Sequence, residues 1–121
     1  MRPVVLTVRE GPRAHRERTD SREAALERLG ALLEPVVERA RAAQRPRLLG
    51  RLTREIPAKE IVYARFELRG AGRPCGVDVR ADGSVVPFSG RWRRRPLSAP
   101  TTPKGAIRAL SAHLSEEPFS T

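Results

Sequence analysis

Three short segments in the second half of the chain alternate apolar and polar residues, the pattern of β-strands that bury one face. They are residues 60–69 (EIVYARFELR), 75–80 (CGVDVR) and 84–88 (SVVPF). The connections between them are short, and Asp82-Gly83 is typical of a tight hairpin turn in which both central residues take positive φ. We therefore predict an antiparallel meander of three strands, with Pro87 marking an edge or a bulge.

Two amphipathic helices are predicted to accompany this sheet. Asp20 can cap the first helix, with Glu23 at the capping-box position, and Pro35 predicts a kink or a restart within it. The apolar stripe of this helix consists of Leu26, Leu29, Leu33, Val36 or Val37, and Ala40. Thr102 can cap the last helix and Pro103 suits its first position. The stripe of the last helix consists of Ile107, Leu110 and Leu114.

The remaining segments complete the element order. Residues 3–9 (PVVLTVR) alternate as a first strand, residues 10–19 are expected to form a polar loop, and residues 45–58 are ambiguous between a helical turn and an irregular strand. The order β-α-β-β-β-α indicates a small α+β two-layer sandwich: an antiparallel three- to four-stranded sheet with a long N-terminal helix and a short C-terminal helix. A chain of 121 residues fits one domain, expected over residues 1–115 and followed by a short acidic tail at 116–121.

Several classes of protein are disfavoured by the residues present. Cys75 is the only cysteine, so an internal disulfide is impossible. No window approaches the ~18 apolar residues of a membrane span, and the first apolar stretch is too short for a signal peptide. We therefore expect a cytoplasmic protein without a membrane partner. His15, Cys75 and His113 lack the spacing of a metal site, and no glycine-rich phosphate loop is present, so we expect no metal and no cofactor.

Positive charge is concentrated in the middle of the chain. The net charge is +10, from 24 basic and 14 acidic residues. Residues 1–38 are neutral overall, whereas residues 39–108 carry 17 bases and five acids, a net charge of +12. Segregation of this kind predicts a basic face and an anionic partner.

The most basic stretch is RWRRR at residues 91–95, and no acid lies near it in the sequence. Arginine forms bidentate contacts with phosphate, and the single Trp offers a ring on which bases can stack. The residues predicted to bind nucleic acid here are Arg91, Trp92, Arg93, Arg94 and Arg95. A second patch is predicted at Arg45, Arg47, Arg51 and Arg54, provided that these residues lie beside the first. The alternative is a solvated loop in which Trp92 covers the core.

The polar face of the predicted meander is another candidate surface. Val62, Ala64, Phe66 and Leu68 are expected on the buried face, which places Tyr63, Arg65, Arg69 and Arg80 on the open face. An aromatic residue with arginines on a sheet suits single-stranded nucleic acid. Glu67 and Asp78 share this face, and cross-strand ion pairs with Arg65 and Arg80 are the alternative interpretation.

The leading functional prediction is a small, basic, non-enzymatic nucleic-acid-binding protein that contacts the phosphate backbone. RNA or a ribosomal site is favoured over DNA on element order. The order helix, three strands, helix resembles that of the double-stranded-RNA-binding domain, and ribosome-hibernation factors add a first strand. The resemblance is limited to this order, because TTPKGAIRAL has a single lysine where the last helix of that domain carries a lysine-rich signature.

Two other functions stay open. The proline-rich stretch at residues 96–103 and the sheet edge near Pro87 fit a protein-interaction adaptor, or an inhibitor of an acidic partner. The segments Glu67-Leu68-Arg69 and Asp78-Val79-Arg80 resemble the acid-x-lysine pairs of metal-dependent nucleases, although arginine is a poor substitute for a lysine that must lose a proton. An enzymatic role is therefore not the favoured one, and an exposed sheet is compatible with a homodimer.

Overall fold

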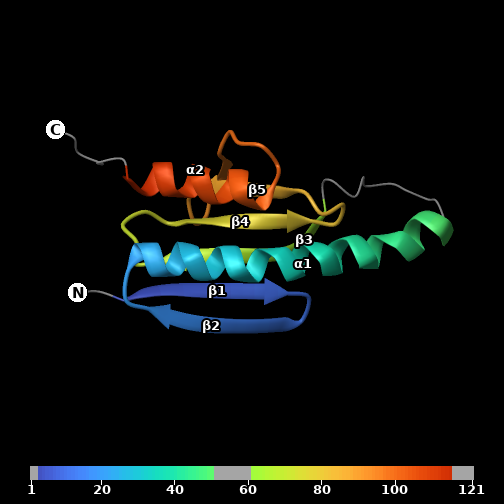
Figure 1. Ribbon diagram of the computed structural model, residues 1–121, viewed down its shortest axis with the longest axis horizontal. Helices are drawn as coiled ribbons and strands as arrows, with labels where there is room; N and C mark the ends of the chain where they lie inside the picture. The colour runs from blue at the N-terminus through green and yellow to red at the C-terminus, as the bar shows by residue number, and fades with distance from the viewer. Residues whose placement is uncertain (1–2, 51–60, 116–121) are drawn as a thin grey trace.

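One antiparallel sheet and two helices make up the part of the chain that the computed structural model describes, residues 3–50 and 61–115, with the backbone alone described for residues 44–50. The elements are β1 (Val4–Glu10), β2 (Arg13–Thr19), α1 (Arg22–Gly50), β3 (Val62–Arg69), β4 (Cys75–Arg80), β5 (Val85–Ser89), β6 (Arg95–Pro96) and α2 (Pro103–Ser115). The strands pair in the order β2-β1-β3-β4-β5-β6, and both helices lie on the same face of the sheet (Figure 1).

The predicted α+β class with two helices is confirmed, but the number of strands and the element order are not as expected. The sheet has six strands rather than three or four, and a strand precedes α1 where a loop was predicted. Residues 13–19 (RAHRERT) pair with β1 at seven successive positions, although they show no apolar alternation. An edge strand needs no such pattern, because most of its side chains face water. The sequence signal for this hairpin is Gly11-Pro12, a two-residue loop with glycine at its first position and a φ of 61°.

The first helix is continuous through Pro35, where a kink or a restart was predicted. Pro35 cannot donate a backbone hydrogen bond to the carbonyl of Ala31. Both residues are exposed, so water can solvate that carbonyl, while Leu33 and Val36 are fully buried on the other side of the helix. The helix is capped by Ser21 rather than by Asp20, since the Ser21 hydroxyl accepts the Ala24 N–H at 3.0 Å.

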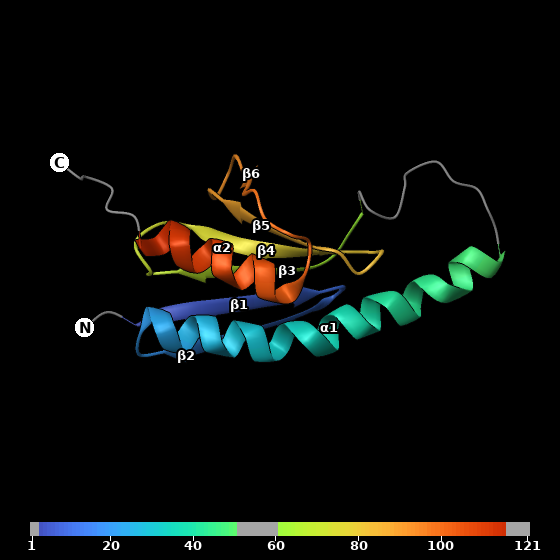
Figure 2. The same cartoon turned by 45° about the horizontal axis from the view of Figure 1, so that its top comes forward.

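The second helix begins as predicted. The Thr102 hydroxyl accepts the Gly105 N–H at 3.1 Å, and Pro103 is the first helical residue. The buried residues of α2 are Ala106, Leu110 and Leu114. The N-terminal end of α1 is joined to the C-terminal end of α2 by a hydrogen bond from Arg22 to the Leu114 carbonyl. In Figure 2 the two helices lie side by side over the sheet, and α1 continues beyond the end of the sheet.

The turn between β4 and β5 differs from the predicted two-residue type. Arg80 N–H donates to the Ser84 carbonyl and Gly83 N–H donates to the Arg80 carbonyl, which makes a three-residue loop. Only Gly83 has a positive φ, 89°, as expected for a type I turn followed by a left-handed glycine. Pro87 is accommodated in β5 because its carbonyl accepts Leu97 N–H on the β6 side, so the missing proline N–H is not needed for the pairing with β4.

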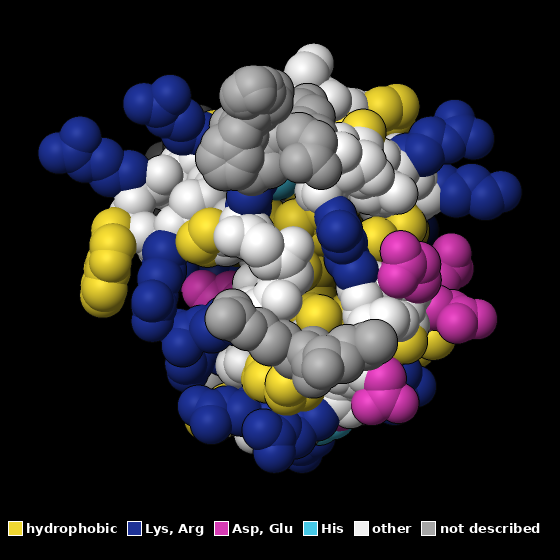
Figure 3. Space-filling model, turned by 90° about the vertical axis from the view of Figure 1, so that its left-hand side faces the viewer, with side chains coloured by type: hydrophobic (Ala, Val, Ile, Leu, Met, Phe, Trp, Pro, Cys, Tyr) yellow, Lys and Arg dark blue, Asp and Glu magenta, His cyan; other side chains and the backbone are white. Residues whose placement is uncertain are grey.

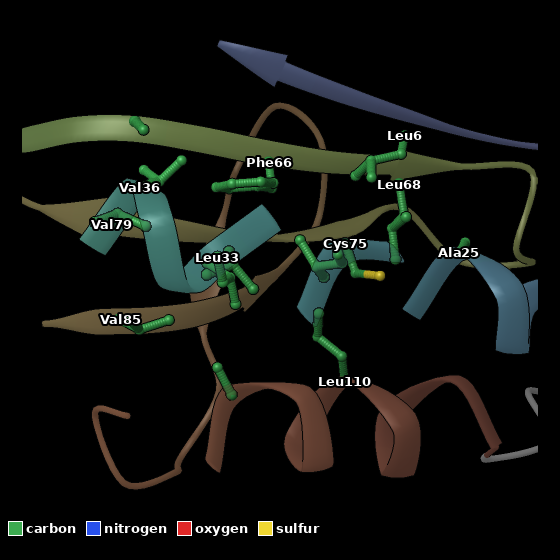
Figure 4. Close-up of a cluster of buried hydrophobic side chains, with 14 of the residues drawn as sticks. Leu6, Ala25, Leu33, Val36, Phe66, Leu68, Cys75, Val79, Val85 and Leu110 are labelled. Atoms are coloured by element: carbon green, nitrogen blue, oxygen red, sulfur yellow. The ribbon is translucent and has the colours of Figure 1, made fainter. Parts of the chain in front are cut away.

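The hydrophobic core lies between the helices and one face of the sheet. Figure 4 shows Leu33 and Val36 of α1 and Leu110 of α2 directed into the same cluster as Phe66, Val79 and Val85 from the strands. Ala64, Phe66 and Leu68 are buried as predicted, but Val62 is 41% exposed. A register irregularity between Val62 and Ala64 interrupts the alternation there. Tyr63 consequently packs against the core and leaves the open face to which it was assigned.

Ion pairs join α1 to the hairpin of β1 and β2. Arg39 binds Glu10 through two hydrogen bonds of 2.8 and 2.9 Å, and the Tyr63 hydroxyl donates to the same carboxylate at 2.9 Å. Arg28 binds Glu17 in the same bidentate manner. The hydrogen bonds from Arg39 hold the pKa of Glu10 below its usual value, although burial acts in the opposite direction. Both contacts place acidic residues of the hairpin toward the helices.

Replacing Leu33 by alanine is expected to lower the free energy of unfolding by about 2–5 kcal/mol, because a fully buried side chain would leave a cavity under α1. Urea unfolding followed by circular dichroism measures the change. Glu34→Ala, on the exposed side of the same turn, is the matched control and should change stability by no more than ~0.5 kcal/mol. Equal effects of the two substitutions would contradict the packing described for α1.

Candidate nucleic-acid interface

The face of the sheet turned away from the helices is rich in arginine. Because successive residues of a strand point to opposite faces, the residues between the core positions of β1, β3 and β4 lie on this open face. Cross-strand pairing of Thr7 with Arg16 and of Val5 with Arg18 places two arginines of β2 on it as well. The arginines of the open face are Arg9, Arg16, Arg18, Arg65, Arg69, Arg80 and, through its contacts described below, Arg94.

The acidic residues are distributed differently. Figure 3 views the molecule from one end of the sheet, and most Asp and Glu side chains lie on its right, on the side of the helices. Lys and Arg side chains dominate the left and the lower part of the same view. On the open face, the described strands contribute only two carboxylates, those of Glu67 and Asp78.

Each of these two carboxylates is bound by an arginine. Arg65 donates to both oxygens of Asp78 over 2.6 and 3.1 Å. Arg94 Nη2 donates to Glu67 Oε2 at 2.7 Å. The hydrogen bonds to Asp78 raise the pKa of Arg65, against the effect of burial. The cross-strand ion pair between Arg65 and Asp78 is therefore present as expected. Glu67 differs from the expectation, because it binds Arg94 of the β5–β6 loop and not a strand residue.

A phenylalanine of β5 forms the base for these two arginines. Phe88 is only 3% exposed although it lies on the open face, paired across the strands with Gly76. The guanidinium carbons of Arg65 and Arg94 lie 5.6 and 5.4 Å from the centre of its ring, which is cation–π geometry. A Cβ at Gly76 would lie 2.7 Å from the Phe88 ring and 2.0 Å from the Phe66 carbonyl oxygen, so only glycine fits beneath the ring.

The predicted site at residues 91–95 is the loop between β5 and β6. Arg91, Arg93 and Arg95 are exposed, whereas Arg94 turns back to Glu67 and Phe88. Trp92 is 84% exposed, so the alternative in which it covers the core is wrong. The Arg91 guanidinium lies 5.6 Å from the Trp92 ring. The stretch thus presents three arginines and an indole ring to solvent, and uses its fourth arginine to attach the hairpin to the open face.

The described half of the second predicted patch, Arg45 and Arg47, does not lie next to this hairpin. Arg45 and Arg47 belong to the last turns of α1, which extend past the sheet and away from the β5–β6 hairpin in both ribbon views (Figures 1 and 2). Arg51 and Arg54 lie outside the described residues. The expectation that the two clusters form one surface therefore has no support in the described part of the chain.

Sequence reasoning missed the arginines that β1 and β2 contribute. Arg9, Arg16 and Arg18 were assigned to the neutral first part of the chain, and their register became visible only once β2 was paired with β1. Arg9 lies directly opposite Arg65 across the β1–β3 pairing. Arg9 already belonged to the strand predicted over residues 3–9, and recognition of the Gly11-Pro12 turn would have placed Arg16 and Arg18 on the sheet as well.

Residues that suit metal binding are not brought together in the described segments. No group of three or more His, Cys, Asp or Glu residues among them is placed to hold a metal ion. Cys75 is buried in the core, which raises the pKa of its thiol to about 11. Glu67 and Asp78, the carboxylates considered for a nuclease, each accept a hydrogen bond from arginine.

Comparisons with protein-family models, with the curated proteins and with the solved structures found no match to this chain. Neither helix, in the part of the chain with assigned structure, combines the length and the apolar character needed to cross a membrane. The functional argument therefore depends on the geometry of the open face alone.

A double-mutant cycle on Arg65 and Asp78 is expected to give a coupling energy of about 1–3 kcal/mol in urea unfolding. The pair is bidentate and mostly shielded, with side-chain exposures of 28% and 10%. The matched control is the pair of Arg41 and Glu38, which is separated by 3.7 Å and exposed by 55% and 73%. Its coupling should stay below ~0.5 kcal/mol. Similar couplings for the two pairs would contradict the structural role given to Arg65.

Proposed function

We propose that this protein binds nucleic acid through the open face of its sheet and the adjoining β5–β6 hairpin, and that it contacts mainly the phosphate backbone. The observation that carries the proposal is the charge balance of the open face: both of its carboxylates are already bound, while Arg9, Arg16, Arg18 and Arg69 are exposed and have no ion pair among the described residues. A polyanion supplies the missing negative charge, and release of its counterions drives binding.

The placement of Arg9 opposite Arg65 supports the proposal independently of the number of charged residues on the open face. Like charges directly opposite each other on neighbouring strands destabilise a sheet. Asp78 compensates Arg65, whereas Arg9 has no ion pair among the described residues. The repulsion between Arg9 and Arg65 has a functional explanation if the positive charge of Arg9 binds an anionic ligand.

RNA is the nucleic acid that we favour. The exposed ring of Trp92, beside the arginines of the hairpin, suits unpaired bases and their backbone, as in the common RNA-binding modules. The earlier reason, a likeness in element order to the double-stranded-RNA-binding domain, is weakened by β2, which precedes α1 here. The preference therefore rests on the surface rather than on the order of elements.

The other functions have less support. The proline-rich segment, considered as a docking strand for a protein partner, is held by its own sheet: Leu97 N–H donates to the Pro87 carbonyl, and Val85 N–H donates to the Thr101 carbonyl. A nuclease would need carboxylates free to bind a metal ion, whereas those of the open face are engaged by arginines.

Three double substitutions that each remove two positive charges test the assignment of the surface. Arg9→Ala/Arg16→Ala changes the sheet face, Arg93→Ala/Arg95→Ala changes the hairpin, and Lys104→Ala/Arg108→Ala changes the exposed side of α2 as a control. Binding of a fluorescently labelled single-stranded RNA is measured by anisotropy over a range of salt concentrations. The first two variants should bind more weakly. The slope of the logarithm of the binding constant against the logarithm of the salt concentration (the salt slope) should become smaller in magnitude by about one to two, because each lost phosphate contact removes ~0.7 from it.

The control variant should keep the salt slope of the unchanged protein. If all three variants lose affinity equally, the protein attracts nucleic acid only through its net charge and the open face is not the site. If the unchanged protein binds no nucleic acid at low salt, the proposed function itself is wrong. Capture of a protein partner that survives nuclease treatment would then favour the adaptor function.

A further inference from the structure

A hollow of about 250 Å³ opens between the loop that joins β3 to β4 and the base of the β5–β6 hairpin. Three arginines from three different segments line it: Arg69 at the end of β3, Arg73 in the loop and Arg91 in the hairpin. Among the described residues that line it, Glu67 contributes the only carboxylate, and that carboxylate is bound by Arg94. The hollow is therefore suited to an anionic group.

The two walls of the hollow are joined by the backbone. Gly90 N–H, at the base of the hairpin, donates to the carbonyl of Pro74 in the opposite loop at 2.9 Å. Phe88, over whose ring the guanidinium groups of Arg65 and Arg94 lie, also lines the hollow. A site with such walls is largely formed before a ligand arrives, which lowers the entropic cost of binding.

Trp92 directly follows Arg91, which lines the hollow. The large hydrophobic side chains exposed in the described segments are Val62 and Trp92, and Trp92 is the more exposed at 84%. An indole ring in water next to an arginine is a stacking surface for a nucleobase. Bases within a duplex are stacked on each other and do not offer their faces to a side chain.

We propose that this hollow holds a backbone phosphate of a single-stranded nucleic acid, and that a neighbouring base of the same strand stacks on Trp92. Arg69 and Arg91 provide the donors for the phosphate, in the fork geometry that suits its oxygens. Arg73, whose Nη1 lies 3.5 Å from His113 Nδ1, adds positive charge to the same hollow. The site consequently selects single strands over duplexes. This inference rests on the proposed function and adds to it the form of nucleic acid and the place of one nucleotide.

Trp92 is the single tryptophan of the chain, so its intrinsic fluorescence reports on the site without a label. The protein is titrated with single-stranded RNA, single-stranded DNA and duplex DNA of about 12 nucleotides, a length within the range bound by single-strand modules. Both single strands should quench the fluorescence of Trp92 and bind about tenfold or more tightly than the duplex. A difference in affinity between single-stranded RNA and single-stranded DNA would show that the protein also recognises the sugar.

Two pairs of variants separate stacking and phosphate binding from overall charge. Trp92→Leu should lose the preference for single strands, whereas Trp92→Phe, which keeps an aromatic ring, should retain most of it. Arg69→Gln should weaken single-strand binding several-fold more than Arg18→Gln. Arg18 is the matched control because both arginines lie beside Val5 on the open face, but only Arg69 lines the hollow.

The outcomes distinguish the two proposals. Tight, salt-dependent binding of labelled oligonucleotides without any change in Trp92 fluorescence, or with equal affinity for the duplex, would overturn this inference and leave nucleic-acid binding in place. Equal effects of Arg69→Gln and Arg18→Gln would overturn the assignment of the hollow. Absence of binding to every oligonucleotide at low salt would overturn both proposals.

Discussion

Both helices pack their apolar stripes on the same face of the sheet, and the character of the opposite face follows from this arrangement. An antiparallel sheet that is covered on one side can leave its other face in water, and a large apolar side chain on that face is then covered locally. Here the closure is local: Phe88 lies over Gly76 and beneath the guanidinium groups of Arg65 and Arg94. Asp78 and Glu67 hold those two groups in place. Phe88 is thereby shielded without a second hydrophobic layer.

This closure divides the arginines of the open face into two kinds. Arg65 and Arg94 have carboxylate partners and shield Phe88, so they act as part of the fold. Arg9, Arg16, Arg18 and Arg69 are exposed and have no ion pair in the described segments. The hairpin that carries Trp92 is attached to the same face through Arg94. The arginines that hold the fold and those that we propose as ligand contacts are therefore different residues of one surface, which a count of charges along the chain does not reveal.

Much of the architecture could be predicted from local patterns. The alternation in residues 60–69 and the stripe of Leu29, Leu33 and Ala40 identify buried faces directly, because burial imposes a period on the sequence. β2 was not predicted because an edge strand that is exposed to water does not need alternating apolar residues. Pro35 was misjudged because its effect depends on whether the freed carbonyl meets water, which only the placement of α1 decides.

The candidate site was harder to predict than the fold, since it depends on contacts between distant segments. Glu67 and Arg94 are separated by 27 residues and Phe88 meets Arg65 across β4, so neither contact is visible in a local pattern. The sequence placed Arg94 among the ligand contacts, and the structure shows it bound to the sheet. The exposure of Trp92, in contrast, agrees with the stacking role considered from its arginine-rich surroundings.

The central claim is that nucleic acid lies on the helix-free face of the sheet. Backbone amide chemical shifts, followed by NMR during titration with a single-stranded RNA, test it most directly. The account predicts changes concentrated in β1, β2, β3 and the β5–β6 hairpin, with the amides of α1 and α2 that face away from the sheet unaffected. Changes concentrated in the helices, or spread evenly over the molecule, would contradict it.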